Sequence, residues 1–233
     1  LANFLTSDRG RTGRGGFTEK QVRDAFARLR QCATGIDGLS KQWVSPLHAT
    51  LVPFMTALFS YLYAHGKAIS AWTLAVIVAV KKREPSLVDM SNFRGIHLLQ
   101  FMRQWYAACL MPELENLCER VVPEEQQGFW KGGRIFASYM AFHAVIERAR
   151  LSGERLYVAF VDVRRAFPSV RRDILWWKLS ALGTPDHLVR ALVELYTDVQ
   201  GSVRGAQGLS SIFNIDLGTR EGGVESPLLC VFS

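Results

Sequence analysis

The chain has 233 residues, enough for one domain or two small ones with a sizeable core. Hydrophobic residues make up 48% of it, which excludes a disordered chain. The 28 Lys and Arg against 21 Asp and Glu give a net charge of +7, which favours an anionic partner, nucleic acid before membrane, although a basic surface kept for solubility gives the same balance.

The N-terminal part should be helical after a basic segment. Residues 1–17 are rich in Gly and Arg, and they suit either phosphate contacts or a loose end because they cannot build a core. Thr18 and Gln21 have the spacing of a capping box, which predicts a helix start. Four apolar residues at helical spacing would form its buried face: Val22, Ala25, Phe26 and Leu29.

Two long helices and two extended segments are predicted next. The helices cover residues 46–65 and 100–120. Between them, the apolar residues 73–80 predict a strand, and a turn at 81–85 leads from it toward residues 92–96. The hairpin-like turn indicates that the two extended segments lie side by side.

Neither the apolar stretches nor the cysteines indicate a membrane or a metal site. Pro46 and Pro53 interrupt the uncharged residues 44–66, and the apolar run 74–80 is too short to span a bilayer. We therefore expect a core helix, a core strand and no membrane partner. The four cysteines and five histidines lack the spacing of a zinc site or disulfide framework, which favours buried thiols in a reducing compartment.

A loop at 122–134 and a helix at 135–151 precede the most informative segment. Residues 156–161 are all apolar or aromatic, which predicts a strand buried on both faces, and Asp162 follows directly. A buried carboxylate is costly unless a cation or donors meet it, and Mg²⁺ fills this role where nucleotides are handled. The alternative is an ordinary strand-end Asp that caps the next turn.

Residues after Asp162 should form helices and a hairpin. Gly183 separates two predicted helices, 171–182 and 185–197, and Thr184 would cap the second. Turn residues and alternation predict the remaining elements: a hairpin of 203–208 and 211–217, and a helix beginning at Ser226. Three alternating residues would bury one face of the second hairpin strand: Phe213, Ile215 and Leu217.

Five sequence blocks resemble, in order, those of reverse transcriptases, specifically the type found in non-LTR retrotransposons and group II introns. The segment YVAFVDVRRAFPSV, residues 157–170, resembles the first catalytic motif. The other blocks are TGIDGL at 34–39, a Trp-to-NFRGI segment at 72–99, QGF at 127–129 and GTREGGVESPLL at 218–229.

The resemblance implies roles for particular residues. Asp162 would be the catalytic metal ligand, with the Val163 carbonyl beside it, and Mg²⁺ is implied only if other sequence completes the site. Further residues would bind the incoming nucleotide: Lys81, Arg94, Phe167, which would crowd the sugar 2′ position, and Glu221. A third group would contact nucleic acid: Gln127, Lys131, Arg134, Arg164 and Arg165. Without the resemblance, Phe167 indicates a core residue and Lys81 a solvated turn.

The chain also departs from the family pattern. Pro168 stands where a second Asp is usual, and Glu221 stands where the family has Gln. No Tyr-x-Asp-Asp hairpin occurs before residue 233. Because one Asp cannot build a two-metal site, we expect that this chain alone does not polymerise DNA. The missing hairpin would leave apolar strand surface that another protein chain or a large ribonucleoprotein should cover.

The resemblance implies an α+β fold with right-hand polymerase-like fingers and a partial palm, in which helices pack on a small antiparallel sheet. The expected division is a basic segment at 1–17, a fingers-like region at 18–150 and a partial palm at 151–233. Three functions remain open. The chain is a fragment that binds RNA or serves as a structural subunit of a ribonucleoprotein, or it is part of an active RNA-directed DNA polymerase completed by another chain. The third alternative is a generic basic protein-interaction domain whose motif matches are accidental. We expect an intracellular location, nuclear or mitochondrial.

Overall fold

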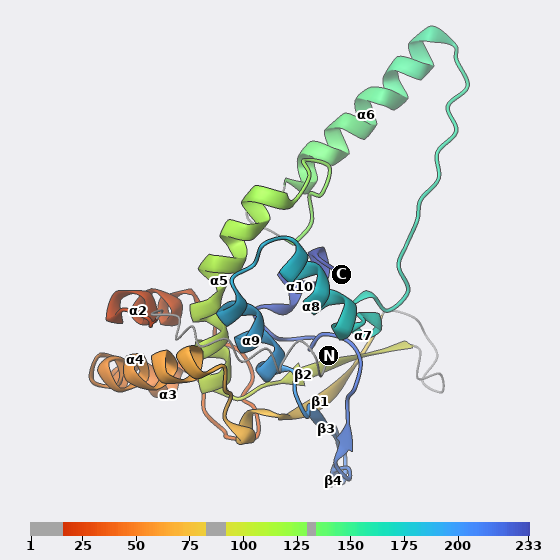
Figure 1. Cartoon of the computed structure of the whole chain (residues 1–233). Coiled ribbons are helices and arrows are strands. Elements are labelled where there is room, and N and C mark those ends of the chain that lie inside the picture. The colour runs from red at the N-terminus through yellow and green to blue at the C-terminus, as the bar shows by residue number, and fades with distance from the viewer. Residues whose placement is uncertain (1–15, 83–91, 130–133) are drawn as a thin grey trace.

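A computed structural model describes residues 16–82, 92–129 and 134–233 of the chain. Most of the basic segment 1–17, the end of the turn at 81–85 and Lys131 lie outside the described residues. A small sheet lies at one edge of the molecule beside a group of helices, and one long helix, α6, projects away from the rest (Figure 1).

The first helices form as their local sequence predicts. Helix α2, Glu19–Arg28, begins at a capping box in which the Thr18 side chain accepts from the backbone N–H of Gln21 and the Gln21 side chain accepts from that of Thr18. Its apolar face is buried, as predicted. The next helical segments are α3, Lys41–Val44; η1, Ser45–Leu47; α4, His48–His65; and η2, Ser70–Trp72.

Helix α5, Phe101–Val121, runs through the centre of the core and confirms the helix predicted at 100–120. Trp105 is fully buried, and its indole N–H donates to the Val22 carbonyl of α2 at 2.8 Å. Asp37 lies in the TGIDGL block and accepts from the backbone N–H of Phe101 at 3.0 Å. A first-turn N–H that has no intrahelical partner is thereby satisfied.

The sheet is mixed, where an antiparallel sheet was expected. Strands β1, Leu74–Lys81, and β2, Phe93–Leu98, pair antiparallel as predicted. Strand β3, Gln200–Gly205, then pairs with β1 in parallel, because helices connect the two strands. The sheet therefore joins the predicted fingers-like and palm regions, and the division between them stays a prediction.

The predicted hairpin after residue 200 is shorter than expected. Among the described residues, the strands that pair antiparallel with β3 are the two-residue strands β4, Gly208–Leu209, and β5, Phe213–Asn214. The buried face expected for its second strand is wrong, because Phe213 and Leu217 are exposed and only Ile215 packs partly against the core.

Four helices complete the C-terminal part: α7, Ala166–Ser169; α8, Arg172–Ala181; α9, Asp186–Leu195; and α10, Ser226–Val231. Gly183 adopts a left-handed conformation with φ of 78°, which confirms its predicted role after α8. Pro185 is the N-cap of α9, one residue later than the Thr184 predicted. The α9 core face is buried with α4 and α8.

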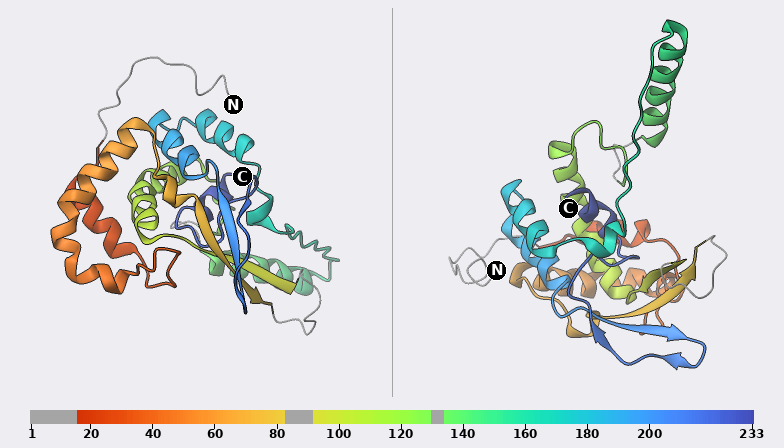
Figure 2. Two further views of the ribbon diagram at one scale, coloured as in Figure 1. Left: turned by 90° about the horizontal axis from the view of Figure 1, so that it is seen from below. Right: turned by 90° about the vertical axis from the view of Figure 1, so that its right-hand side faces the viewer.

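The predicted strand at 156–161 is wrong. Helix α6, Ile135–Ser152, projects from the body, and residues 154–163 return beside it as an extended coil that pairs with no strand of the described chain (Figures 1 and 2). We call residues 135–163 the arm. None of its residues is buried, and the exposed fraction of Val161 is 92%. An apolar run predicts burial only where a partner exists to bury it.

One helical run among the described residues, Lys41–His65, is long and apolar enough to cross a membrane by length and composition alone. A helix that packs inside a folded domain passes the same test. Here α4 packs against α2 and α9 through buried residues such as Phe59 and Leu62. The packing accounts for part of the apolar composition, because 22% of the 18-residue window that meets this test is buried while side chains such as Phe54 and Tyr61 are exposed.

Candidate nucleotide site

The loop at 218–225 lies between the end of β2 and α7. The backbone N–H of His97 on β2 donates to the Glu221 carbonyl at 2.6 Å. On the other side, the N–H of Thr219 donates to the Phe167 carbonyl at 2.8 Å. Two of the predicted nucleotide-binding residues, Phe167 and Glu221, are therefore brought to one loop cluster.

Two glycines allow the loop to lie this close. Gly218 has φ of 83°, and a Cβ there would lie 2.6 Å from the Pro168 Cα. Gly222 has φ of 126°, and a Cβ would collide with the His97 carbonyl. Both positions require glycine for conformation and for space.

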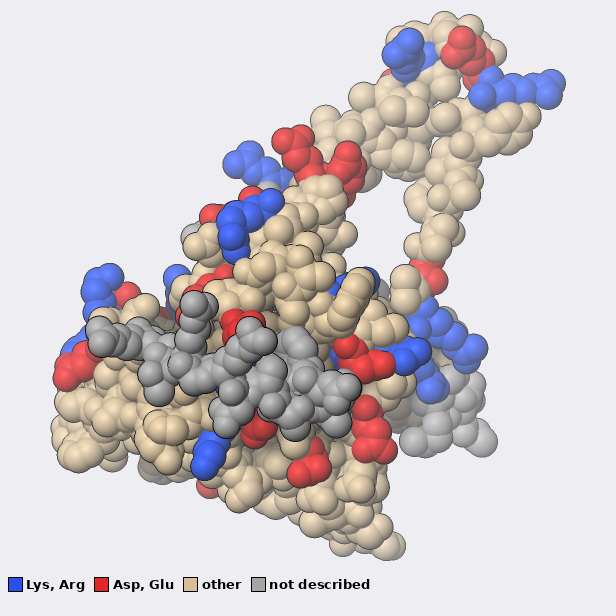
Figure 3. All heavy atoms as spheres, in the orientation of Figure 1, with Lys and Arg blue, Asp and Glu red and all other residues tan. Residues whose placement is uncertain are grey.

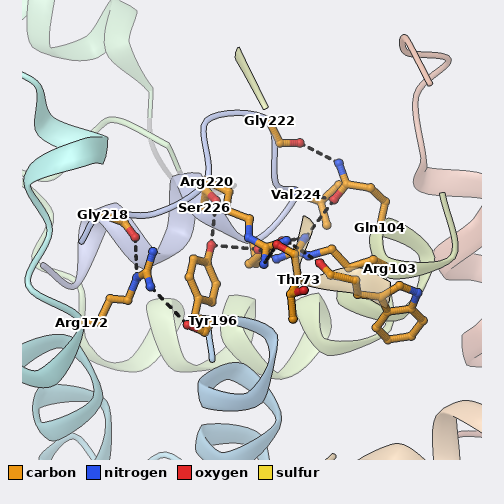
Figure 4. Close-up of polar contacts among 12 residues, drawn as sticks. Thr73, Arg103, Gln104, Arg172, Tyr196, Gly218, Arg220, Gly222, Val224 and Ser226 are labelled. Carbon is orange, nitrogen blue, oxygen red and sulfur yellow. Dashed lines mark hydrogen bonds and ion pairs between the residues drawn. The ribbon is translucent and has the colours of Figure 1, made fainter. Parts of the chain in front are cut away.

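A buried ion pair anchors the C-terminal end of the loop (Figure 4). The Arg103 guanidinium of α5 donates to Glu225 at 2.6 Å, and both side chains are fully buried. The hydroxyl of Tyr196, the C-cap residue of α9, donates to the same carboxylate at 2.9 Å. Burial opposes the charge on Glu225, but the Arg103 guanidinium holds the pKa of this carboxyl below its usual value. The pair fixes the start of α10 to α5 and α9.

Arg220 points inward from the same loop. Its guanidinium donates to the carbonyls of Trp72 at 2.8 Å and Thr73 at 3.2 Å, just before β1. Burial and the nearby Arg103 charge lower the pKa of Arg220 to about 9, so the group stays protonated at neutral pH. The loop is thus tied to the sheet as well as to α5.

Gln104 and Arg172 hold the loop backbone at two further points. The Gln104 amide donates to the Gly222 carbonyl at 2.6 Å, and Arg172 donates to the Gly218 carbonyl at 2.8 Å (Figure 4). Both glycines are therefore held by a side chain from another helix. A loop fixed this way presents its one outward acidic side chain, Glu221, in a defined place.

Arg94 and Glu221, both predicted nucleotide-binding residues, form an ion pair of 4.0 Å between Arg94 Nε and Glu221 Oε2. Lys82 also interacts electrostatically with Glu221. The register pairs Lys81 with Phe93 and Val80 with Arg94. Because residues opposite one another share a sheet face, Lys81 lies on the face away from Arg94. Lys82, rather than Lys81, accompanies Arg94 at this site.

Phe167 lies against the QGF block. Its ring contacts that of Phe129 with centroids 5.6 Å apart in an edge-to-face arrangement. The Gln127 side chain accepts from the Arg134 N–H at 2.5 Å and donates to the Glu124 carbonyl. The Gln127 amide thus shapes its own loop, and Phe129 carries the contact to Phe167.

Asp162 has an exposed position on the extended coil. Asp162, Val163, Arg164 and Arg165 are all exposed at the end of the extended coil. Figure 3 shows basic side chains gathered below the coil that descends from α6. Within residues 16–82, 92–129 and 134–233, no group of three His, Cys, Asp or Glu side chains could hold a metal ion. The predicted metal ligand is thus on the exposed coil of the arm, whereas Glu221 is on the anchored loop.

Sequence reasoning missed Lys82 and the Arg103–Glu225 pair. Successive side chains of a strand point to opposite faces, so Lys81, at the end of β1, and Lys82, directly after it, should face opposite sides. This alternation is the sequence signal that could have identified Lys82. Nothing local marks Arg103 and Glu225, which are 122 residues apart in sequence.

A family model described as reverse transcriptase (RNA-dependent DNA polymerase) matches residues 80–233, well over half of the chain. The matched range contains Arg94, Phe167, Glu221 and the buried anchors of the loop. The TGIDGL block precedes it. This chain therefore belongs to the reverse transcriptase family.

Proposed function

We propose that this chain binds RNA and nucleotide as part of an RNA-directed DNA polymerase, of the type found in non-LTR retrotransposons and group II introns, and that it does not polymerise by itself. The supporting observation is a contrast within one site. Arg94, Phe167 and Glu221 are gathered around a rigid loop, whereas Asp162 lies on an exposed coil with no strand partner in the described chain.

Magnesium is the metal that this family implies, and the described residues do not fit it as they stand. A two-metal site needs several carboxylates within a few ångströms of both ions. Asp162 is exposed, and no cluster of potential ligands occurs among the described residues. We therefore derive no catalytic step through Mg²⁺ in this arrangement, and expect a site only when other strands order the Asp162 segment.

A partner that supplies strands would suit the arm. Its coil has apolar side chains on both sides, as in a central strand, including Tyr157, Phe160 and Val161, and its backbone has no ladder to join in the described chain. A protein segment that pairs with residues 156–161 would bury these side chains and fix Asp162. Another chain or a large ribonucleoprotein would supply it within an intracellular assembly.

Primer extension tests the proposal. The purified chain, an RNA template with a DNA primer, deoxynucleotides and Mg²⁺ should give binding without extension. Binding should weaken steeply with salt, because each phosphate contact releases counterions. The Arg164→Ala/Arg165→Ala variant should bind the template more weakly than wild type. Extension by the chain alone, abolished in Asp162→Asn, would refute the non-polymerising part, and a flat salt response would refute RNA binding.

A second candidate is an RNA-binding structural subunit with no catalytic role in any assembly. Pro168 in place of a second Asp, and Glu221 in place of Gln, favour it. Extension by the native assembly that disappears in Asp162→Asn would exclude this candidate. Extension that is unchanged in the Asp162→Asn assembly would favour this candidate. The absence of extension from both the native and the Asp162→Asn assembly would also favour it.

A further inference from the structure

The two side chains of the Arg94–Glu221 ion pair differ in their exposure to solvent. The Arg94 side chain is 65% exposed, whereas that of Glu221 is only 19% exposed. Glu221 is held through its backbone by His97, and its neighbours Gly218 and Gly222 are fixed by other helices. The carboxylate is therefore the rigid partner, and the guanidinium is the one that can turn toward a ligand.

The surroundings of Glu221 are basic on the outer side. Arg94 on β2 and Lys82 after β1 interact with it, while the buried Arg220 points the other way, to the carbonyls before β1. Burial and the Arg220 charge lower the pKa of the His97 imidazole to about 4, so His97 is neutral near pH 7. Glu221 thus forms an ion pair with Arg94, and its carboxylate also lies within the electrostatic influence of Lys82.

We propose that Glu221 is a specificity-determining residue: it occupies Arg94 and Lys82 in competition with the phosphates of an incoming nucleoside triphosphate, and so sets the phosphate affinity of this site. The proposal rests on the nucleotide binding proposed above. A polyphosphate anion must displace the carboxylate from the guanidinium, and it approaches against the carboxylate's negative charge. The site therefore discriminates against weakly bound anions.

The competition has a pH signature. Burial raises the pKa of the Glu221 carboxyl, and the charges of Arg94 and Lys82 oppose that rise. Protonation removes the competitor, so wild type should gain affinity on acidification relative to Glu221→Gln. The ligand's own protonation is the same for both proteins and cancels in the ratio of their Kd values.

Calorimetric titration with two probes tests the proposal: inorganic tripolyphosphate, which has no base or sugar, and a deoxynucleoside triphosphate, both with Mg²⁺. Glu221→Gln should bind both probes about three- to tenfold more tightly than wild type at pH 7.5 and low salt. The gain should shrink toward pH 5. Glu119→Gln, the same charge change on the exposed end of α5, should leave both Kd values within about twofold.

Arg94→Ala completes the design. It should weaken binding of both probes, and Glu221→Gln should give little gain in the Arg94→Ala background, because the two residues act as one unit. Arg94-dependent binding by wild type without tighter binding by Glu221→Gln would overturn this inference and leave nucleotide binding intact. A gain restricted to the deoxynucleotide would also overturn it. No binding by wild type or by Glu221→Gln would overturn both this inference and the proposed nucleotide binding.

Discussion

The arm of this molecule is richer in apolar residues than the body, yet the body buries its apolar residues and the arm does not. In the body, α5 and its neighbours bury Trp105, Phe59 and Leu110 completely. In the arm, Phe160 and Val161 are exposed by 84% and 92%. The difference is one of partners: the body contains the surfaces that bury its apolar residues, whereas the described part of the chain buries no residue of the arm, although the Phe160 ring contacts that of Phe142 on α6.

The same contrast divides the candidate site. The nucleotide side is fixed by buried hydrogen bonds and an ion pair, so its geometry belongs to the folded body. Asp162 belongs to the arm, and under the proposal above its position depends on a partner that pairs with the coil. We therefore expect that substitutions in the body change stability, whereas matched substitutions in the arm change association.

The largest expected difference is between two phenylalanines. Phe59→Ala in the fully buried core of the body should lower the free energy of unfolding by about 3–5 kcal/mol, because it removes buried area and leaves a cavity. Phe160→Ala in the arm should cost less than about 0.5 kcal/mol. Urea denaturation of both variants measures this difference. Equal losses would show that the arm is packed in solution.

The buried ion pair gives the next contrast. Glu225→Gln leaves the Arg103 charge buried without its counter-ion, and should cost about 3 kcal/mol. Glu147 of the arm pairs with Arg150 on the exposed α6 surface at 3.0 Å, and Glu147→Gln should cost less than about 0.5 kcal/mol.

The control for this contrast is a variant in which apolar residues replace both buried charged residues. The double variant Arg103→Met/Glu225→Leu should recover much of the stability lost in Glu225→Gln, because no charge remains buried. Loss of less than about 1 kcal/mol in Glu225→Gln would mean that water reaches the pair.

The fold was predictable wherever its cause is local. The capping box at Thr18 and Gln21, and the stop at Gly183, follow from a few neighbouring residues, and both are present. The strand predicted at 156–161 failed because pairing is not local. Its composition shows that it suits a sheet interior, but no residue nearby tells whether the partner strands are available.

The candidate site shows the same limit at finer scale. The sequence identified Arg94, Phe167 and Glu221, and the structure gathers them around one loop. The sequence did not distinguish Lys81 from Lys82, because a shift of one residue in register moves a side chain to the other face of the sheet. Roles that the resemblance assigned to individual residues stay predictions.

Substitution of one histidine in the body, His97, and of one in the arm, His143, should have different effects on how stability depends on pH. Burial lowers the pKa of His97 to about 4 from its ordinary 6.5, so the folded state binds fewer protons than the unfolded state between these values. His97 thus contributes stability that is present above pH 6.5 and is lost as pH falls toward 4, by about 3 kcal/mol.

The measurement is the free energy of unfolding from pH 7 to pH 4. The His97→Gln variant should lose less of it over this range than wild type, whereas His143→Gln, on the exposed arm helix, should follow wild type. Parallel curves for wild type and His97→Gln would mean that the imidazole can be protonated in the folded state without cost.

Two left-handed glycines give the smallest contrast. Gly218 and Gly153 have φ of 83° and 70°, so alanine strains the backbone at both positions. At Gly218 the new Cβ would also lie 2.6 Å from the Pro168 Cα, whereas nothing lies within 4 Å at Gly153 in the arm. Gly153→Ala should therefore cost about 1 kcal/mol, and Gly218→Ala about 2–3 kcal/mol. Thermal unfolding of both variants separates the cost of backbone strain from the cost of the close contact. Equal shifts in Tm would mean that the loop can move away from the new Cβ without cost, and so does not hold Glu221 in place.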